Sequence, residues 1–365
     1  MKHLYIHFPF CESRCDYCDF FSRAGGLEQA PAYVEAVLAE IEAEVPDSTG
    51  LETVYLGGGT PTLLGGELLS EVMAVVLGRC GPGAEITVEA NPSTVSRELA
   101  ESLAEAGVNR VSLGAQSFNP ALRRNLGRRG PVESIGDAIA AFRAAGFENI
   151  GLDLMFGIPG QDRAALVKDL ENALALGPAH VSCYELTVKE GSSFQQRWRR
   201  ELDVAARAGR EFYEVVIDTL EGAGFRWYET SNFARPGFEC RHNLAYWRGE
   251  DFIGLGAGAW SSVGARRWHN VEDLGLYLKH ASCGDWRALR EYEELPREVR
   301  IAESLMLGLR CDVGVARCNV AGAIDVEQEK LLLRNGFLLN EGGRICLTRQ
   351  GRFVANEVCA RLLRD

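Results

Sequence analysis

The 365-residue sequence lacks a long hydrophobic run. No stretch of about eighteen consecutive apolar residues occurs, which excludes a transmembrane helix of ordinary length. The chain begins with Met1-Lys2-His3 and continues directly into a strand-like segment, so we expect no targeting peptide. Eleven cysteines without a regular disulfide framework favour a reducing compartment, and we expect a cytoplasmic location.

Positive charge is also scarce. Lys and Arg number 39 against 51 Asp and Glu, which gives a formal net charge of -12 at pH 7. Nucleic acids and anionic membranes attract basic surfaces, so this balance argues against a general partner of either class. We expect no nucleic-acid partner and no integral membrane segment. The length indicates one large catalytic domain with smaller appended units.

A fourth thiol is missing from the cysteine group near the amino terminus. Cys11, Cys15 and Cys18 have the spacing Cys-x3-Cys-x2-Cys and follow the apolar segment 4–8. Because the next cysteine is Cys80, a structural zinc site with four ligands fits poorly, and so does a disulfide framework. Three thiolates suit a 4Fe-4S cluster in which one iron stays open to another ligand.

Short apolar runs alternate with helical stretches from residue 2 to about residue 190. This alternation is typical of repeated βα units and a parallel sheet. We predict an α/β fold, a partial (β/α)6 barrel, with strands at 4–8, 53–56, 86–89, 110–114, 150–155 and 180–186. The functional side chains should then lie beyond the carboxyl ends of these strands. A long helix is predicted at about 195–221.

Polar residues and glycines occur at the ends of several predicted strands. The glycine run 57–59 lets the backbone approach a ligand closely, although a tight turn is the alternative interpretation. Glu89 ends the third strand. Asp153 lies in an apolar strand, where an acid is costly unless it is paired with backbone donors or bound to a ligand. Together these groups indicate a polar ligand with hydroxyls and charges.

The cysteine spacing and the glycine run resemble those of the radical S-adenosylmethionine (SAM) superfamily. The resemblance implies that SAM chelates the open iron through its amino and carboxylate groups. An external electron donor would then allow cleavage of SAM to a 5'-deoxyadenosyl radical. It also implies that Tyr17 packs near the adenine, and that Gly58, Gly59 and Thr60 hold the methionine amino group.

The resemblance narrows to the HemN-like family, which contains the oxygen-independent coproporphyrinogen III oxidase HemN and the haem chaperone HemW. The matching segments are 4–11, 57–62, 89–92, 114–118, 126–128 and 153–160. The resemblance implies that Tyr5, Glu89 and Arg128 contact SAM, and that Gln116 and Asp153 hold its ribose hydroxyls. Carboxylate, amide and guanidinium groups suit these roles. The other arginines in 123–129 are interpreted as a solvated face.

Residues 240–247, Cys-Arg-His-Asn-Leu-Ala-Tyr-Trp, contain one histidine among aromatic residues. A lone histidine is more often structural than a ligand, so both interpretations stay open on general grounds. The octet resembles the His-Asn-x-x-Tyr-Trp motif associated with haem binding in HemW, which implies that His242 is the haem-linked residue. Imidazole is a common axial ligand of haem iron. The sequence has no Cys-x-x-Cys-His motif for covalent attachment at this point.

The remaining segments are predicted as smaller units. Residues 231–237 are predicted to form a loop, and 254–261 to form close-packed backbone near the active site. Helices followed by a hairpin at 337–347 resemble a winged-helix module. We therefore divide the chain into a radical SAM partial barrel (1–235), a HemN-type extension (236–295) and a winged-helix-like unit (296–365).

Two functions are compatible with these patterns. The favoured one is a haem chaperone that binds haem and transfers it to an acceptor protein, and that carries a 4Fe-4S cluster with exchangeable SAM. The alternative is oxidative decarboxylation of coproporphyrinogen III. HemN carries an additional cysteine where this chain has Phe20, and a long extension before the first strand. We therefore expect a chaperone without oxidase activity, and we assign no catalytic residue.

Overall fold

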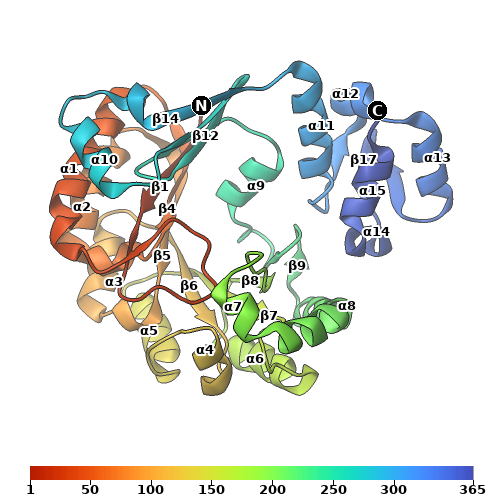
Figure 1. Ribbon diagram of the computed structural model, residues 1–365, viewed down its shortest axis with the longest axis horizontal. Helices are drawn as coiled ribbons and strands as arrows, with labels where there is room; N and C mark the ends of the chain where they lie inside the picture. The colour runs from red at the N-terminus through yellow and green to blue at the C-terminus, as the bar shows by residue number, and fades with distance from the viewer. Residues whose placement is uncertain (365) are drawn as a thin grey trace.

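Six parallel strands form the centre of the protein in the computed structural model, which describes residues 1–364 (Figure 1). In order across the sheet, they are β1 (His3–Phe8), β4 (Leu51–Gly58), β5 (Cys80–Ala90), β6 (Arg110–Gln116), β7 (Asn149–Phe156) and β8 (His180–Glu185). Each predicted strand overlaps one of these six. The prediction of an α/β fold with six parallel strands is therefore confirmed.

Helices connect the parallel strands and cover one face of the sheet (Figure 1). They include α1 (Ala30–Glu44), α2 (Gly65–Leu77), α3 (Arg97–Glu105), α4 (Pro120–Asn125), α5 (Glu133–Ala144) and α6 (Arg163–Ala175). Alternation along β1 sets the two faces: Leu4, Ile6 and Phe8 are fully buried, and the Phe8 ring meets Tyr33 of α1. The intervening Tyr5 points to the opposite, concave face, where it stacks on a tyrosine of β4.

Short strands extend both edges of this sheet. They are β10 (Asn232–Ala234) and β9 (Arg226–Trp227) beside β8, then β11 (Phe252–Leu255), β12 (Trp260–Val263), β13 (Arg266–Asn270) and β14 (Arg290–Glu294) beside β1. The loop prediction for 231–237 was wrong at β10, because three residues pair with β8 in a segment too short to show a period. The β11 to β14 strands belong to the same sheet as the barrel, so the predicted boundary at residue 236 stays an interpretation.

The predicted long helix is divided in two. The structure has α7 (Ser193–Arg197) and α8 (Arg199–Gly222), separated at Trp198, whose backbone leaves the helical region at φ -110° and ψ 20°. Ser192 caps α7 by accepting a hydrogen bond from the backbone N–H of Gln195. The apolar face of α8 lies on the barrel as predicted, with Phe212 and Val216 buried.

The carboxyl-terminal unit has a hydrophobic core of its own, which includes Leu305, Ile345 and Leu362. Its elements are α11 (Arg297–Gly308), β15 (Val315–Ala316), α12 (Arg317–Val320), α13 (Val326–Arg334), β16 (Leu338–Glu341), β17 (Arg344–Leu347), α14 (Arg349–Phe353) and α15 (Ala355–Leu362). The predicted hairpin is present as β16 and β17. Within residues 1–364, no helix is long and apolar enough to cross a membrane.

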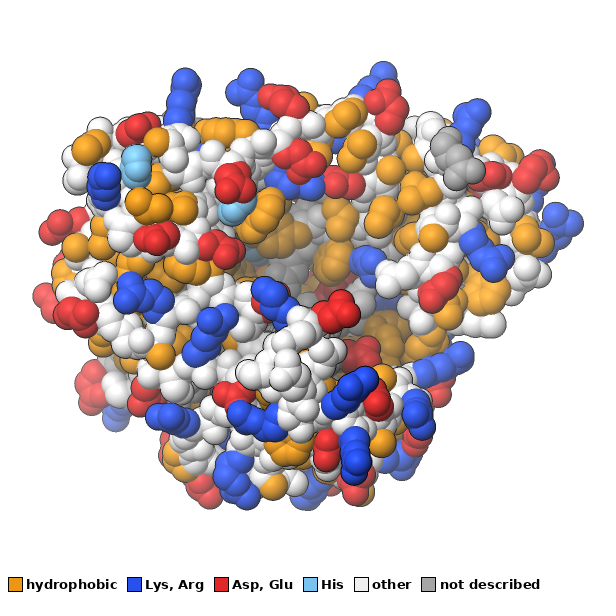
Figure 2. Space-filling model, in the orientation of Figure 1, with side chains coloured by type: hydrophobic (Ala, Val, Ile, Leu, Met, Phe, Trp, Pro, Cys, Tyr) orange, Lys and Arg blue, Asp and Glu red, His pale blue; other side chains and the backbone are white. Residues whose placement is uncertain are grey.

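One short helix, α9 (Arg241–Trp247), lies between the barrel and the carboxyl-terminal unit (Figure 1). It contacts β4 on the concave face and α11 of the carboxyl-terminal unit. The space-filling view shows a hollow in the middle of this side of the molecule, with hydrophobic side chains at its margins (Figure 2). Residues 240–247, which resemble a haem-binding motif, therefore lie on the concave face of the sheet.

Candidate cofactor site

A pocket of about 370 Å³ lies at the carboxyl ends of the parallel strands. Its position agrees with the rule that ligands of parallel sheets bind at this end. It brings together most of the predicted site residues, namely Cys11, Cys15, Tyr17, Cys18, Gly58, Gly59, Thr60, Glu89, Gln116, Arg128 and Asp153. Two predicted residues, Tyr5 and His242, are not part of its lining.

Cys11 is the last residue of β2 (Phe10–Cys11), which pairs with β3 (Arg23–Ala24), and Cys15 and Cys18 lie on the loop between these two strands. Within the loop, the backbone N–H of Cys18 donates to the carbonyl of Cys15 over 3.1 Å. Partial burial raises the pKa of both Cys11 and Cys15, and the nearby Arg128 guanidinium lowers the pKa of Cys15. The loop thus presents thiols beside a cation that favours the thiolate.

The thiols do not converge on one point. In the described part of the chain, no three His, Cys, Asp or Glu side chains come together as ligands of a single metal ion. The three cysteines of a 4Fe-4S cluster bind three different iron atoms, so their sulfur atoms surround the cluster instead of meeting at one ion. The donor set of Cys11, Cys15 and Cys18 fits a cluster of this kind.

The glycine run at the end of β4 lies against the backbone that leads into the cysteine loop. A Cβ atom at Gly59 would lie 2.5 Å from the carbonyl oxygen of Phe10, and one at Gly58 would lie 2.5 Å from the His7 ring. Gly58 also has a φ of 108°, which disfavours other residues. Thr60 follows and donates from its hydroxyl to Cys11 Sγ over 4.0 Å. These glycines therefore allow both the turn and the close approach of the loop.

Glu89 projects from the end of β5 into the pocket. Its carboxylate accepts hydrogen bonds from the Tyr55 hydroxyl at 2.9 Å and from the backbone N–H of Gly58 at 3.1 Å. Desolvation by the barrel and the neighbouring Asp153 carboxylate raise the pKa of Glu89 to about 7, although the hydrogen bonds from Tyr55 and Gly58 lower it. Near neutral pH this group can therefore gain or lose a proton when a charged ligand binds.

Asp153 occupies the equivalent position on β7. Its two oxygens accept from the Ser112 hydroxyl at 3.0 and 3.1 Å. Desolvation raises the pKa of Asp153, while hydrogen bonds from Ser182 and Ser112 lower it. Sequence reasoning missed Ser112 and Tyr55, which also line the pocket. The alternation of β6 could have found Ser112, because it lies two residues before Gly114 and shares its face.

Gln116 and Arg128 complete the far side of the pocket. Gln116 is the only non-glycine residue with positive φ (65°) among residues 1–364, at an irregularity in the pairing of β6 with β7. With its amide oriented to suit both neighbours, Gln116 donates to the Asp153 carbonyl oxygen and accepts from Arg128 Nη2, each at 3.2 Å. Arg128 also donates to the Gly114 carbonyl, and its buried Nε has no partner in the described residues. This orphaned donor suits an anionic group such as a carboxylate.

The arginines near Arg128 do not form a uniformly solvated face. Arg123 is 2% exposed and donates from Nη1 to the Ala115 carbonyl oxygen at 2.6 Å. The interpretation of this arginine as a surface residue was therefore wrong. Its side chain supports the end of β6 from behind, a role that depends on tertiary contacts and leaves no local signal in the sequence.

Tyr5 lies on the concave face beside the pocket lining. Its hydroxyl is 3.0 Å from Nδ1 of His7, and its ring stacks on Tyr55 with centroids 6.2 Å apart. Tyr55 in turn holds Glu89. The structure thus places Tyr5 behind the residues that line the pocket, where it can act on a ligand through Tyr55 and Glu89.

His242 is buried at 1% exposure, and both of its ring nitrogens are occupied. Nδ1 lies 2.7 Å from the Thr53 hydroxyl and Nε2 lies 2.9 Å from the Tyr246 hydroxyl. Burial lowers the pKa of His242 to about 3, so the ring is neutral at physiological pH. In this conformation the imidazole has no free lone pair to offer to a metal.

Comparison with known proteins identifies the family. Residues 5–173 match the model of the radical SAM superfamily. The chain is 38% identical over 377 residues to the heme chaperone HemW of Mycobacterium tuberculosis, covering 99% of this chain and 94% of that protein. It is 36% identical to the heme chaperone HemW of Bacillus subtilis, covering 100% and 99% of the two chains. The chain belongs to the HemW family.

The fold of this HemW family member is also that of a solved radical SAM enzyme. Coproporphyrinogen III oxidase (HemN) from Escherichia coli superposes with a TM-score of 0.77, covering 99% of this chain and 89% of that one. The two sequences are only 21% identical, so this likeness shows the fold alone. It shows that the HemN-like fold extends over 99% of this chain, including the carboxyl-terminal unit.

Radical SAM proteins carry a 4Fe-4S cluster and SAM, and the residues of the pocket fit both groups. The cysteine loop would supply thiolates for the cluster. Glu89 and Asp153 would supply carboxylates for an ammonium group or hydroxyls, and Arg128 would supply a free donor for a carboxylate. When bound, the cluster and SAM together supply one-electron chemistry. The protein residues would enclose and orient the ligand, and Glu89 can hold or release a proton near neutral pH.

Proposed function

We propose that the protein is a haem chaperone, which binds haem and passes it to an acceptor protein. The observation that carries this proposal is the match to HemW proteins over nearly the full length of both chains. Conversion of coproporphyrinogen III is the alternative, and the likeness to HemN supports only the fold. Phe20 is 66% exposed at the edge of the pocket, at the position where the HemN resemblance requires a thiol.

Within this function, we propose specific roles for the residues of the pocket. Cys11, Cys15 and Cys18 hold the 4Fe-4S cluster. The SAM-binding residues are Tyr5, Tyr17, Gly58, Gly59, Thr60, Glu89, Gln116, Arg128 and Asp153. The support for these roles is that all of them except Tyr5 line one pocket at the strand ends, with carboxylates and an orphaned guanidinium donor.

The role of His242 in haem binding stays a prediction, and the structure shows what must change before this residue can bind iron. Its imidazole must first release Thr53 or Tyr246 before either nitrogen can coordinate iron. Such a release requires a rearrangement of α9, because the ring is buried between that helix and β4. We further propose that the protein receives electrons from an external donor, transfers haem to an acceptor protein and is located in the cytoplasm.

The test is a paired assay on one anaerobically reconstituted preparation. Haem is titrated into the protein and followed by absorption, and a second sample receives coproporphyrinogen III, SAM and a reductant. We expect saturable haem binding and no protoporphyrinogen IX. Steady formation of protoporphyrinogen IX, or the absence of saturable haem binding, contradicts the proposal. A Cys15→Ala variant is the control that separates cluster-dependent turnover from background.

A further inference from the structure

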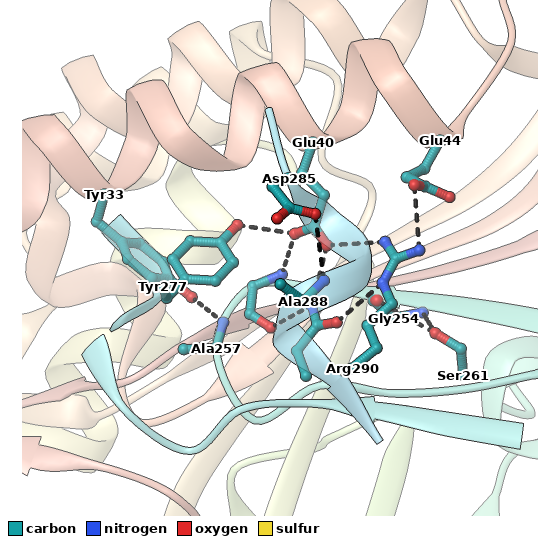
Figure 3. Close-up of polar contacts among 12 residues, drawn as sticks. Tyr33, Glu40, Glu44, Gly254, Ala257, Ser261, Tyr277, Asp285, Ala288 and Arg290 are labelled. Atoms are coloured by element: carbon teal, nitrogen blue, oxygen red, sulfur yellow. Dashed lines mark hydrogen bonds and ion pairs between the residues drawn. The ribbon is translucent and has the colours of Figure 1, made fainter. Parts of the chain in front are cut away.

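Several arginines of this protein are buried together with partners. Arg79 and Arg123 donate to backbone carbonyl oxygens at 2.7 Å and 2.6 Å. Arg290 lies against α1 (Figure 3), where its guanidinium is 3.3 Å from the buried carboxylate of Glu40 and 3.1 Å from that of Glu44. These contacts follow the rule that a charge removed from water needs hydrogen bonds or an opposite charge.

Arg110, the first residue of β6, is different. It is only 1% exposed, and among residues 1–364 it has no ion-pair partner and its Nε has no hydrogen bond. A guanidinium keeps its proton in proteins, so it cannot escape the cost of burial by becoming neutral. The position of Arg110 therefore requires negative charge in its surroundings, although no carboxylate is in direct contact with it.

Acids lie on both strands beside Arg110. On β5, its register partner is the residue halfway between Glu85 and Glu89, and all three share the concave face because side chains alternate. Toward β7, a Cβ atom on Gly151 would lie 3.6 Å from Nη2 of Arg110, and Gly151 precedes Asp153 by two residues on the same face. The guanidinium thus lies one layer below the cofactor pocket, between β5 and β7.

The lower acid is already engaged by other donors. Glu85 accepts from the first two backbone N–H groups of α9, each at 3.1 Å. The two upper acids, Glu89 and Asp153, line the pocket and accept hydrogen bonds from neutral donors. Desolvation raises the pKa of both, and the Arg110 guanidinium lowers the pKa of both. Arg110 therefore favours the ionised form of two acids that it does not touch.

The other titratable or charged groups that face these two acids in the described residues include one cation. They are Tyr5, Tyr17, Tyr55, Tyr184, Tyr246 and Arg128. Burial raises the pKa of all five tyrosines, so they are neutral at physiological pH. Arg128 lies at the far side of the pocket, where it donates to the Gly114 carbonyl. Arg110 is thus the cation at the base of the pocket.

We propose that Arg110 is a positioning residue of the cofactor pocket, which keeps Glu89 and Asp153 available as carboxylates for SAM without occupying their oxygen atoms. A direct ion pair would use the acceptor sites that an ammonium group or hydroxyls of the ligand require. A cation one layer below favours the charged form of both acids through the protein interior. Arg110 is not part of the pocket lining, so it acts through the two acids. The inference rests on the proposed role of this pocket in SAM binding.

The test is equilibrium binding of SAM to the anaerobically reconstituted full chain over a range of pH. We expect Arg110→Met to move the pH midpoint of binding upward by about one unit, because both acids lose a neighbouring cation. Below the midpoint, the dissociation constant should therefore rise about tenfold. Well above it, the variant should bind at least as tightly as wild type, because SAM is cationic. Arg110→Lys keeps the charge and should keep the midpoint near that of wild type. Arg97→Met, at an exposed position of α3, is the matched control and should leave the profile unchanged.

An infrared titration of the ligand-free protein reads the acids directly. Protonated carboxyl groups have a C=O stretching band that carboxylates lack, and subtraction of the Glu89→Gln spectrum isolates the band of Glu89. In Arg110→Met this band should persist to higher pH than in wild type. An unmoved band together with an unmoved midpoint overturns the inference. A loss of SAM affinity that is equal at every pH also overturns it, because a purely structural role would give that result.

Two further outcomes are decided separately. If wild-type protein does not bind SAM, the proposed role of the pocket fails, and the infrared titration alone decides the effect of Arg110 on the acids. If thermal unfolding shows that Arg110→Met does not fold, it is combined with Glu89→Gln, which removes one of the charges that the cation offsets. The double variant should then regain a cooperative unfolding transition. A double variant that remains unfolded overturns the inference.

Discussion

Single residues in the pocket show how far the barrel changes ordinary side-chain chemistry. Desolvation raises the pKa of both Glu89 and Asp153, and the Asp153 carboxylate raises that of Glu89 as well. The sequence predicted these two acids because each ends or interrupts an apolar strand. It could not predict that both nitrogens of His242 are occupied, since Thr53 lies far away in the chain. Roles that depend on cross-strand contacts leave no local pattern.

Glu89 predicts a pH dependence of SAM binding. Its pKa of about 7 means that both the protonated and the ionised form occur in the ligand-free protein near neutral pH. Because SAM is cationic, binding should favour the carboxylate and should strengthen as the pH rises from 6 to 8. The affinity can change by up to about tenfold per pH unit below the pKa. Equilibrium binding measured at several pH values checks this expectation.

The variant Glu89→Gln should flatten that profile and weaken SAM binding above pH 7. The contribution of Glu89 to the stability of the ligand-free protein should change with pH in the direction opposite to SAM binding. The folded protein holds this proton more tightly than the unfolded chain, whose glutamate has a pKa near 4.5. The contribution of Glu89 to the free energy of unfolding therefore falls as the pH rises from about 4.5 to 7. A profile that is identical in wild type and variant would remove Glu89 from the site.

Elements with a clear period were predictable, and short or interrupted ones were not. The six parallel strands agree with the runs of apolar residues because each strand is buried by helices on one side. By contrast, β10 has three residues and α8 starts after an irregular Trp198, so neither boundary has a periodic signal. The extension β11 to β14 is fixed instead by Glu40, a tertiary contact from α1.

Replacement of Glu40 should loosen that extension. Glu40→Ala leaves the buried Arg290 guanidinium without one of its two carboxylates and removes acceptors from Asn270 and Tyr277. We expect a loss of about 3–5 kcal/mol in the free energy of unfolding, as for other broken buried pairs. Urea denaturation measures it. Glu35→Ala, on an exposed position of the same helix, is the control and should change stability little.

For the molecule as a whole, the carboxyl-terminal unit is attached to the barrel by polar contacts and by the Phe353 ring, which packs on Tyr213 and Trp227. Arg352 of α14 donates to the Trp227 carbonyl oxygen at 2.9 Å, and its guanidinium lies over the Trp227 ring. Arg349 forms exposed ion pairs with Asp218 and Glu221 of α8. The sequence predicted the hairpin of this unit from its own pattern. Its placement beside α8 and α9 depends on contacts between distant segments.

These two arginines should contribute unequally to the attachment. Arg352→Ala removes a hydrogen bond from a largely buried charged group, and we expect it to cost about 1.5–3 kcal/mol. Arg349→Ala removes only exposed ion pairs and should cost less than about 1 kcal/mol. Hydrogen exchange in α14 and α15 reports the local opening. Equal exchange rates in the two variants would show that the attachment does not depend on Arg352.

Electron paramagnetic resonance of the reduced, anaerobically reconstituted protein tests most directly whether the strand-end pocket holds SAM on the open iron of a three-cysteine cluster. The account predicts a 4Fe-4S signal that changes when SAM is added. It also predicts that Cys15→Ala loses the signal, and that Asp153→Asn keeps the signal but needs more SAM for the change. A preparation without cluster iron, or a cluster signal that SAM leaves unaltered, would contradict it.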